Sequence, residues 1–180
     1  MDRKRSIKAA IVAVFAIAVV PAGVVAAWMV TETMVEETSG AEFCGSCHTM
    51  APMVASYRAD VHGGAGLEGV QAKCNYCHVP ADNVFIYMVK KAQFGLHDVW
   101  AQLTYDLDEI DWQAKRAHRT TYVFDSGCLN CHENVERATA PSAAAFIAHR
   151  SYFLGETDVQ CVSCHPHVGH ADLGRHLDEA

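Results

Sequence analysis

A long apolar run near the N-terminus is the first pattern in the chain. From Ala9 to Val30 no side chain is charged or strongly polar, whereas residues 1–8 carry four basic side chains. The 22 residues of the run would form a helix about 33 Å long, enough to cross the hydrocarbon core of a bilayer. Because the run is longer than the apolar region of a cleaved signal peptide, we predict a retained membrane anchor.

The charges on either side of this run predict its orientation. The basic flank at residues 1–8 should stay in the cytoplasm, and the acidic residues Glu32 and Glu36 follow on the far side. We therefore expect a single-pass protein of the bacterial cytoplasmic (inner) membrane, with a transmembrane anchor at residues 9–30. A linker over residues 31–43 would lead to a periplasmic domain at residues 44–180.

A second hydrophobic pattern predicts a helix over residues 81–103. Its apolar side chains recur at helical spacing: Phe85, Met88, Val89, Ala92, Leu96, Val99, Trp100 and Leu103. Such a helix can rest in the membrane interface, with Lys90 and Lys91 near the lipid headgroups. The rest of the chain after residue 40 shows no strand-like alternation. We predict a mainly α fold with much irregular structure and a thin polypeptide core.

All eight cysteines of the chain fall in four copies of the pattern CxxCH. In this pattern the two thiols attach a haem covalently and the histidine binds its iron. Zinc sites and redox-active dithiols also use CxxC pairs, but neither requires a histidine directly after every second cysteine. We predict a tetrahaem c-type cytochrome domain with four covalently bound haem c groups. The attachment residues are Cys44, Cys47, Cys74, Cys77, Cys128, Cys131, Cys161 and Cys164.

The spacing of the motifs predicts a repeated unit. The motifs begin at positions 44, 74, 128 and 161 and so form two pairs. We expect two-haem units at residues 44–80 and 128–170, with the helix over 81–103 between them. In each unit a histidine, His62 or His149, stands 12 residues before the second motif. This equivalence predicts one role for both histidines, as distal iron ligands.

The remaining histidines lack such a repeat. His170 lies too close to the proximal His165 to reach the opposite face of the same haem, but it could bind a neighbouring haem. We prefer His170 to His167, which follows His165 still more closely. Three others are expected to be solvated side chains: His97, His118 and His176.

The formal net charge of −7 argues against nucleic-acid binding, which usually requires a basic surface. Each haem would add two propionates and make the protein more acidic. A partner with basic patches would suit such a surface.

These residues resemble the NapC/NirT family of membrane-anchored tetrahaem quinol dehydrogenases. The layout is most similar to the short NrfH-type members, which feed cytochrome c nitrite reductase. The likeness covers nearly the whole chain from the anchor to His170. It rests on CGSCHTMAPM at 44–53, the run from His62 through CNYCHVP to Pro80, the helix around Lys91 and Asp98, DWQAKR at 111–116, and CVSCH followed by His170.

The resemblance implies particular site residues. In the family the first haem iron is bound by a methionine two residues after the motif histidine, here Met50, so His48 is not expected to bind iron. The other proximal ligands would be His78, His132 and His165, with His62, His149 and His170 as distal ligands. A lysine and an aspartate matching Lys91 and Asp98 line the quinol site of the family. Arg116 is a candidate contact to a haem propionate.

The resemblance implies an electron-transfer subunit with quinol dehydrogenase activity rather than a terminal reductase. The expected donor is menaquinol in the lipid bilayer, and the expected acceptor is a periplasmic multihaem oxidoreductase such as cytochrome c nitrite reductase. The residues also allow an anchored carrier without a quinol site, exchanging electrons with, for example, a hydroxylamine-oxidising enzyme. The Ala-rich stretch from Asn134 to Ser151 is longer than expected for the NrfH type, which leaves the partner enzyme open. An oligomeric arrangement within a larger complex is compatible with the sequence.

Overall fold

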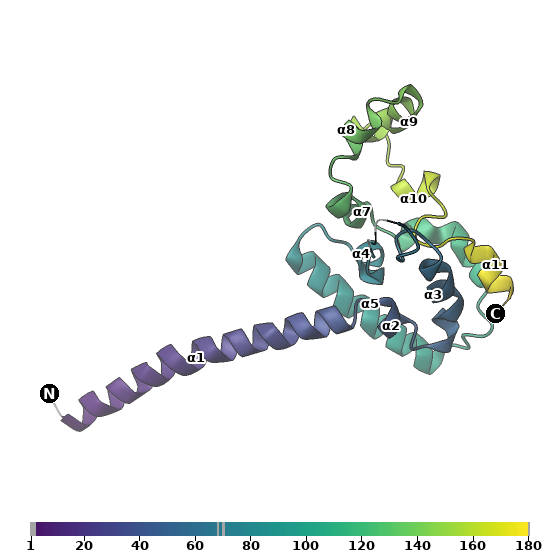
Figure 1. Cartoon of the computed structure of the whole chain (residues 1–180). Helices are drawn as coiled ribbons and strands as arrows, with labels where there is room; N and C mark the ends of the chain where they lie inside the picture. Colours follow the sequence, from purple (N-terminus) through teal and green to yellow (C-terminus); the bar gives the residue numbers. More distant parts are fainter. Residues whose placement is uncertain (1–2, 68, 70, 180) are drawn as a thin grey trace. The chain divides into compact units, whose positions relative to one another are not determined.

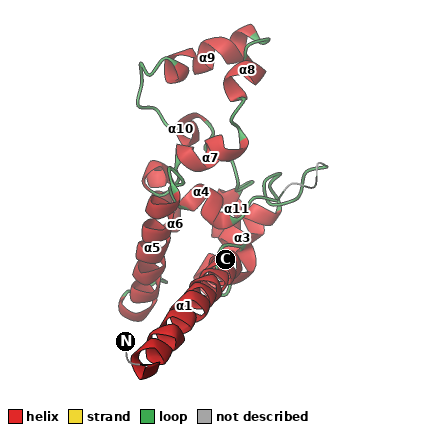
Figure 2. Ribbon diagram, turned by 90° about the vertical axis from the view of Figure 1, so that its left-hand side faces the viewer, coloured by secondary structure: helices red, strands yellow, loops and turns green. Residues whose placement is uncertain are grey.

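The computed structural model describes residues 3–67, 69 and 71–179. The chain divides into two compact units, Met1–Thr38 and Ser39–Ala180. The described residues form helices and loops, with one isolated β-bridge between Gly63 and Gln71 and no longer strand (Figure 2). The prediction of a mainly α chain with much irregular structure is confirmed.

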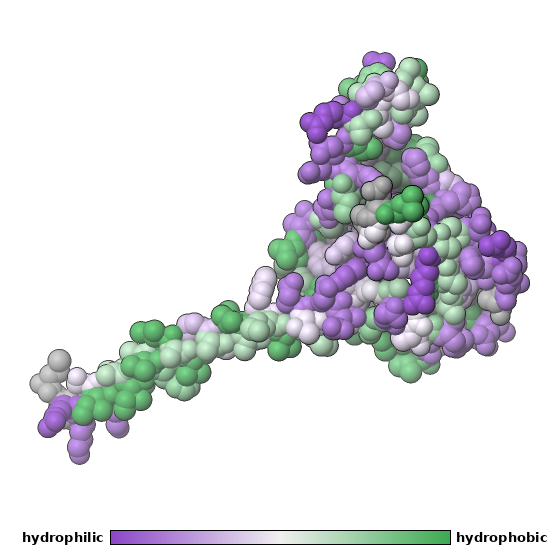
Figure 3. Space-filling view, in the orientation of Figure 1, coloured by the Kyte–Doolittle hydropathy of each residue, from purple (hydrophilic) through white to green (hydrophobic). Residues whose placement is uncertain are grey.

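The first unit is almost entirely one helix, α1 (Arg3–Glu37). It is the one described helix long and apolar enough to cross a membrane, and Figure 3 shows hydrophobic side chains along most of it. Pro21 lies inside the helix without ending it, as transmembrane helices allow. The helix continues past the predicted span to Glu37, and the hydroxyls of Thr31 and Thr33 donate back to carbonyls one turn earlier.

The second unit consists of short helices joined by loops (Figure 1). Its elements in chain order are α2 (Ala41–Cys44), η1 (His48–Met50), α3 (Ala51–Arg58), α4 (Cys74–His78), α5 (Val84–Thr104), α6 (Trp112–Lys115), η2 (Arg116–Thr121), α7 (Asp125–Cys131), α8 (Val135–Thr139), α9 (Ala143–Phe153), α10 (Cys161–Cys164) and α11 (Leu173–Asp178).

Helix α5 is the longest helix of this unit and corresponds to the helix predicted over residues 81–103. It begins at Val84 because the side chain of Asn83 accepts a hydrogen bond from the Ile86 N–H and caps the first turn. Many of its apolar side chains are solvent-exposed, among them Phe85 and Trp100. The helix therefore presents an apolar face that the described residues leave uncovered.

The polypeptide core of the second unit is small. The buried hydrophobic side chains among the described residues are Tyr57, Val79 and Val162. Helices α3 and α11 pack together, and the Ser56 hydroxyl of α3 donates to the Ala171 carbonyl just before α11. A unit of this size with so few buried apolar side chains needs another source of apolar interior.

Candidate functional site

The cysteine motifs lie on separate short helices of the second unit. In α4, α7 and α10 the two cysteines of a motif are three residues apart on one helical turn, so their sulfurs share a side of the helix. In the first motif Cys44 ends α2, and Cys47 follows a turn. All eight cysteines are free of disulfides. The second, third and fourth motifs therefore each offer two thiols on one side, as attachment to the edge of one flat ring requires.

The four motifs follow one another in space in the order of the sequence. The Cys74 thiol hydrogen-bonds to Cys44, which lowers the pKa of Cys44 to about 7 and raises that of Cys74. Burial raises the pKa of Cys77 to about 11, and the nearby Cys128 contributes to the same shift. The sulfurs of Cys128 and Cys161 in turn lie within 4.8 Å of each other. Groups attached to these sulfurs would form one continuous series.

The contact between α4 and α7 joins the first pair of motifs to the second. The Phe124 N–H donates to the Cys77 carbonyl at 3.0 Å. Gly127 lies so close to α4 that a β-carbon at this position would stand 1.8 Å from the Tyr76 carbonyl oxygen. Only glycine allows this approach, so Gly127 determines how closely the second and third motifs can lie.

Asp125 links the third motif to the fourth. Its carboxylate accepts the Cys161 N–H at 2.9 Å. Ligand atoms of Asp125, Cys128 and Cys161 lie within 4.8 Å of one another, but both cysteines belong to CxxCH motifs. We therefore interpret this cluster as part of the junction between motifs rather than as a separate metal centre.

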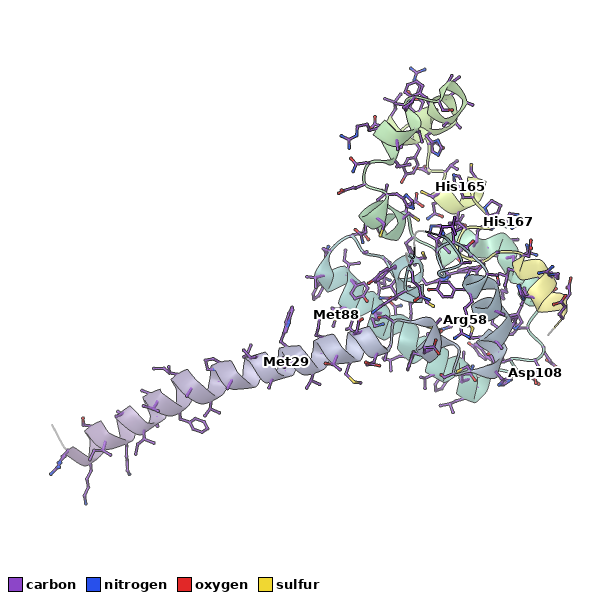
Figure 4. The ribbon with its side chains drawn as sticks, viewed as in Figure 1. Met29, Arg58, Met88, Asp108, His165 and His167 are labelled. Carbon is purple, nitrogen blue, oxygen red and sulfur yellow. The ribbon has the colours of Figure 1, made fainter. Side chains whose placement is uncertain are left out.

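Three histidines of the motifs each face a histidine from elsewhere in the unit. The ring centroids of His62 and His132 are 6.2 Å apart, and those of His78 and His170 are 6.1 Å apart. The rings of His149 and His165 are also separated by 6.1 Å, and Figure 4 labels His165 beside α10.

This separation fits a metal ion between the two rings of each pair. A metal–nitrogen bond of about 2 Å places the metal about 3 Å from the ring centre, so two rings on opposite sides would be about 6 Å apart. Rings in direct packing contact could lie closer together. The three pairs therefore have the spacing that a haem iron with two imidazole ligands requires.

The hydrogen bonds of these histidines leave one ring nitrogen available. The Nδ1 atoms of His78, His149 and His170 donate to backbone carbonyls at 2.8–3.1 Å. Nδ1 of His62 donates instead to a carboxylate, Asp60 Oδ1, at 2.9 Å. A ligating histidine typically uses its second nitrogen in this way, which fixes the ring orientation. Nε2 of each ring is then the natural metal-binding atom.

Burial keeps two of these rings in the form that binds a metal. It lowers the pKa of His78, and burial together with the nearby His78 lowers the pKa of His170 to about 4. Both imidazoles are therefore neutral at physiological pH, as metal ligation requires. Haem groups between the facing rings would also supply the apolar interior that the polypeptide lacks. The residues of the structure therefore fit covalently attached haem.

The first motif has a different arrangement. No described histidine faces His48, whose side chain is 80% exposed and whose Nε2 lies 3.6 Å from Asp108 Oδ1. Met50 is half-buried at the end of η1, where it precedes α3. The structure therefore separates this motif from the other three.

One face of α5 runs beside the first motif. Lys91 Nζ donates to the Ser39 hydroxyl at 3.0 Å, and burial lowers the pKa of Lys91. The charges of Lys91 and Asp98 both act on the Cys44 thiol, so the two side chains predicted for a quinol site lie near this motif. Further along, the Gln102 amide donates to the Thr49 hydroxyl at 3.5 Å.

Some polar residues near this face were not singled out from the sequence. Asn75 is 7% exposed, and its amide nitrogen hydrogen-bonds to the Tyr87 hydroxyl, one turn before Lys91 on α5. Asn75 Oδ1 has no hydrogen-bond partner among the described residues. No motif in the sequence marks this pair, because α4 and α5 meet only in the folded unit.

Arg116 lies apart from the facing histidines. Its guanidinium donates to the Gln113 side chain at 2.7 Å and lies against the backbone of Gly174 in α11. Its predicted contact with a haem propionate stays a prediction. His97, His118 and His167 are exposed, whereas Nε2 of His176 is buried without a partner among the described residues.

Comparison with known proteins supports this interpretation. The NapC/NirT cytochrome c family, N-terminal region, matches residues 4–174. The cytochrome c-type protein TorC of Escherichia coli (strain K12) is 28% identical over 141 residues, covering 73% of this chain but 35% of TorC. The chain thus spans about a third of that relative. The cytochrome c-type protein NrfH of Wolinella succinogenes is 24% identical over 139 residues, covering 75% of this chain and 71% of NrfH.

A solved structure shares the fold. It is the crystal structure of the cytochrome c nitrite reductase NrfHA complex bound to the HQNO inhibitor, with a TM-score of 0.52 and 25% identity. The match covers 86% of this chain and 90% of that one. The motifs, the facing histidines and the apolar helix α1 agree with a membrane-anchored c-type cytochrome with covalently bound haem. Because the family match extends over almost the entire sequence, the chain belongs to the NapC/NirT cytochrome c family.

Proposed function

We propose that the protein oxidises a membrane quinol, expected to be menaquinol, and supplies electrons to a periplasmic multihaem oxidoreductase. The observation that carries this proposal is the position of Lys91 and Asp98 on α5, close to the first cysteine of the first motif. The relative NrfH and the NrfHA complex, named as a cytochrome c nitrite reductase, support a partner of that class. Four bound haems would supply one-electron carriers between the two reactions.

The facing histidines suggest which side chains hold each haem. We assign His78 with His170 to the second motif, His132 with His62 to the third, and His165 with His149 to the fourth. For the first motif we propose Met50 as the iron ligand, because His48 is exposed beside Asp108. The thioether sulfur of methionine is a known axial ligand of c-type haem.

Substitution of the distal histidines tests these assignments. His149→Ala should remove one of the two ligands of a single haem, so that one of the four haems changes from low spin to high spin in the electron paramagnetic resonance spectrum. His167→Ala is the matched control, because His167 is exposed and should leave the spectrum unchanged. An unchanged low-spin spectrum in His149→Ala would contradict the assignment.

At the proposed quinol site the side chains of α5 have distinct roles. Asp98 accepts a proton from the quinol hydroxyl, since an exposed carboxylate can act as a general base and return the proton to water. Lys91 is fixed by the Ser39 hydroxyl and holds the quinol oxygen through an N–H donor. Their spacing of seven residues places the two side chains on one face of α5.

The exposed apolar residues of α5 support contact with the lipid surface. We propose that Phe85, Leu96 and Trp100, with exposed fractions of 74%, 72% and 60%, insert into the interfacial layer of the bilayer. The anchor at residues 9–30 keeps the domain at the membrane. We propose that residues 1–8 remain cytoplasmic and that the domain after residue 31 is periplasmic.

The partner is proposed to bind near α8 and α9. These helices lie together beyond α7 and α10 in both ribbon views (Figures 1 and 2), and α9 carries His149. Phe146 and Ile147 of α9 are exposed. Residues 132–160, which include both helices and their flanking loops, carry four acidic side chains and two arginines, which suits a partner with a basic rim.

A second candidate is an anchored electron carrier without its own quinol site, serving for example a hydroxylamine-oxidising enzyme. The exposure of the Asp98 side chain, 80%, favours this alternative, because a substrate pocket would be expected to shield it. Reduction of the liposome-reconstituted holoprotein by a menaquinol analogue distinguishes the two functions. Rapid reduction that the inhibitor HQNO blocks supports the quinol dehydrogenase. Full reduction by dithionite, without reduction by any quinol, supports the carrier.

A further inference from the structure

Asp60 is the one described carboxylate hydrogen-bonded to a histidine of the three facing pairs. Its Oδ1 atom accepts the ring Nδ1–H of His62 at 2.9 Å and the backbone N–H of the same residue at 2.8 Å. The carboxylate is 11% exposed and the imidazole 32% exposed. The contact is therefore shielded from solvent, where a charged hydrogen bond is stronger than in water.

The surrounding loop holds Asp60 and His62 in fixed positions. The N–H groups of Gly63 and Ala65 donate to the Asp60 carbonyl, and Ala72 N–H donates to the His62 carbonyl at 2.8 Å. A β-carbon on Gly63 would stand 1.8 Å from the Tyr57 carbonyl oxygen. These contacts hold the carboxylate against the Nδ1 atom of the His62 ring.

His62 differs in one respect from the other facing histidines whose Nδ1 partner is known. His78, His149 and His170 donate to neutral backbone carbonyls, whereas His62 donates to a negative charge. A carboxylate partner draws the Nδ1 proton and makes the ring a stronger electron donor to a metal at Nε2. The negative charge also favours the more positive, oxidised state of that metal.

We propose that Asp60 is a positioning residue that lowers the reduction potential of the haem bound at the third motif, through His62. The inference rests on the proposed ligation of that haem by His62 and His132. It gives this haem a different potential from the one that a neutral acceptor would produce. The hydrogen bond reaches only the ligand of this haem, whereas the charge of Asp60 also acts on Cys77 of the second motif and on His170.

The substitution Asp60→Asn separates charge from geometry. The asparagine Oδ1 can still accept both hydrogen bonds from His62, but the negative charge is lost. In the reconstituted holoprotein we expect the ratio of reduced to oxidised haem at the third motif to rise about tenfold at a fixed applied potential, equivalent to about 59 mV for one electron. Redox titration followed by electron paramagnetic resonance measures this ratio.

Two further variants make the result specific. His62→Ala identifies the signal of the third-motif haem, because that signal should become high spin. Glu179→Gln removes the same charge from an exposed position paired with Arg175 and should leave every potential unchanged. A spectrum in which His62→Ala converts no haem to high spin would contradict the proposed ligation itself.

The proposed effect of Asp60 on the potential can be contradicted while the proposed ligation by His62 still holds. If His62→Ala produces one high-spin haem but Asp60→Asn leaves the potential unchanged, the carboxylate does not lower it. If Asp60→Asn itself converts the haem to high spin, Asp60 only holds the ring in place, and the effect on potential is likewise overturned. A raised potential with a retained low-spin signal supports the proposal.

Discussion

Asp98→Asn is expected to slow reduction of the holoprotein by quinol at least about 100-fold, the usual contribution of a positioned general base. The amide keeps the shape of the carboxylate but cannot accept the quinol proton. Reduction by dithionite should remain at the rate of the unmodified protein, since it requires no proton acceptor at α5. Stopped-flow absorbance of the haem bands in liposomes measures both rates.

Two variants make this result specific to the proposed site. Asp82→Asn removes an equal charge from an exposed position just before α5 and should change neither rate. Lys91→Gln should weaken quinol binding, because the ammonium bonded to Ser39 is lost. Equal quinol rates in Asp98→Asn and the unmodified protein would remove the argument for quinol oxidation at α5 and favour the anchored carrier.

Gly127→Ala is expected to destabilise the holoprotein by about 3 kcal/mol, near the upper range for an overpacked interior position. The new methyl group would lie 1.8 Å from the Tyr76 carbonyl oxygen, so α4 and α7 must separate. Separation would also break the hydrogen bond from Phe124 to Cys77. The melting temperature should fall by several degrees, which circular dichroism measures, and the yield of fully loaded protein should fall with it.

Gly40→Ala provides a matched control for this substitution. No atom lies within 4 Å of a β-carbon at Gly40, and its φ of −94° is open to alanine. The control should retain a melting temperature close to that of the unmodified protein. If Gly127→Ala were equally stable, the close approach of α4 and α7 would not be needed to hold the second and third motifs together.

The sequence was most informative where the chemistry is local. The two cysteines and the histidine of each CxxCH motif lie within five residues, so their function does not depend on the path of the rest of the chain. The apolar run over residues 9–30 predicted a membrane-spanning helix for the same reason, because length and composition are properties of one segment. The apolar side chains of α5 recur at helical spacing in the sequence, so the helix was predicted. Its first residue, Val84, is set by the cap from Asn83.

The partners of the histidines depended on the fold. His62 and His149 occupy equivalent positions before a motif. His149 faces His165 of the motif that follows it, whereas His62 faces His132 of the third motif. His170, from the end of the chain, faces His78 instead. Sequence spacing describes the distance along the chain, but the contact of α4 with α7 at Gly127 decides which motif lies beside which loop.

The environment of each candidate residue was likewise a property of the folded unit. The sequence marked Lys91 as half of a charged pair, but its bond to Ser39 and its buried position arise because two distant segments meet. Asp60 stands two residues before His62 in the sequence, which alone does not indicate where its carboxylate points. The sequence determined the covalent chemistry and the anchor. The tertiary structure decided which histidine rings face each other, because long-range packing alone brings those rings together.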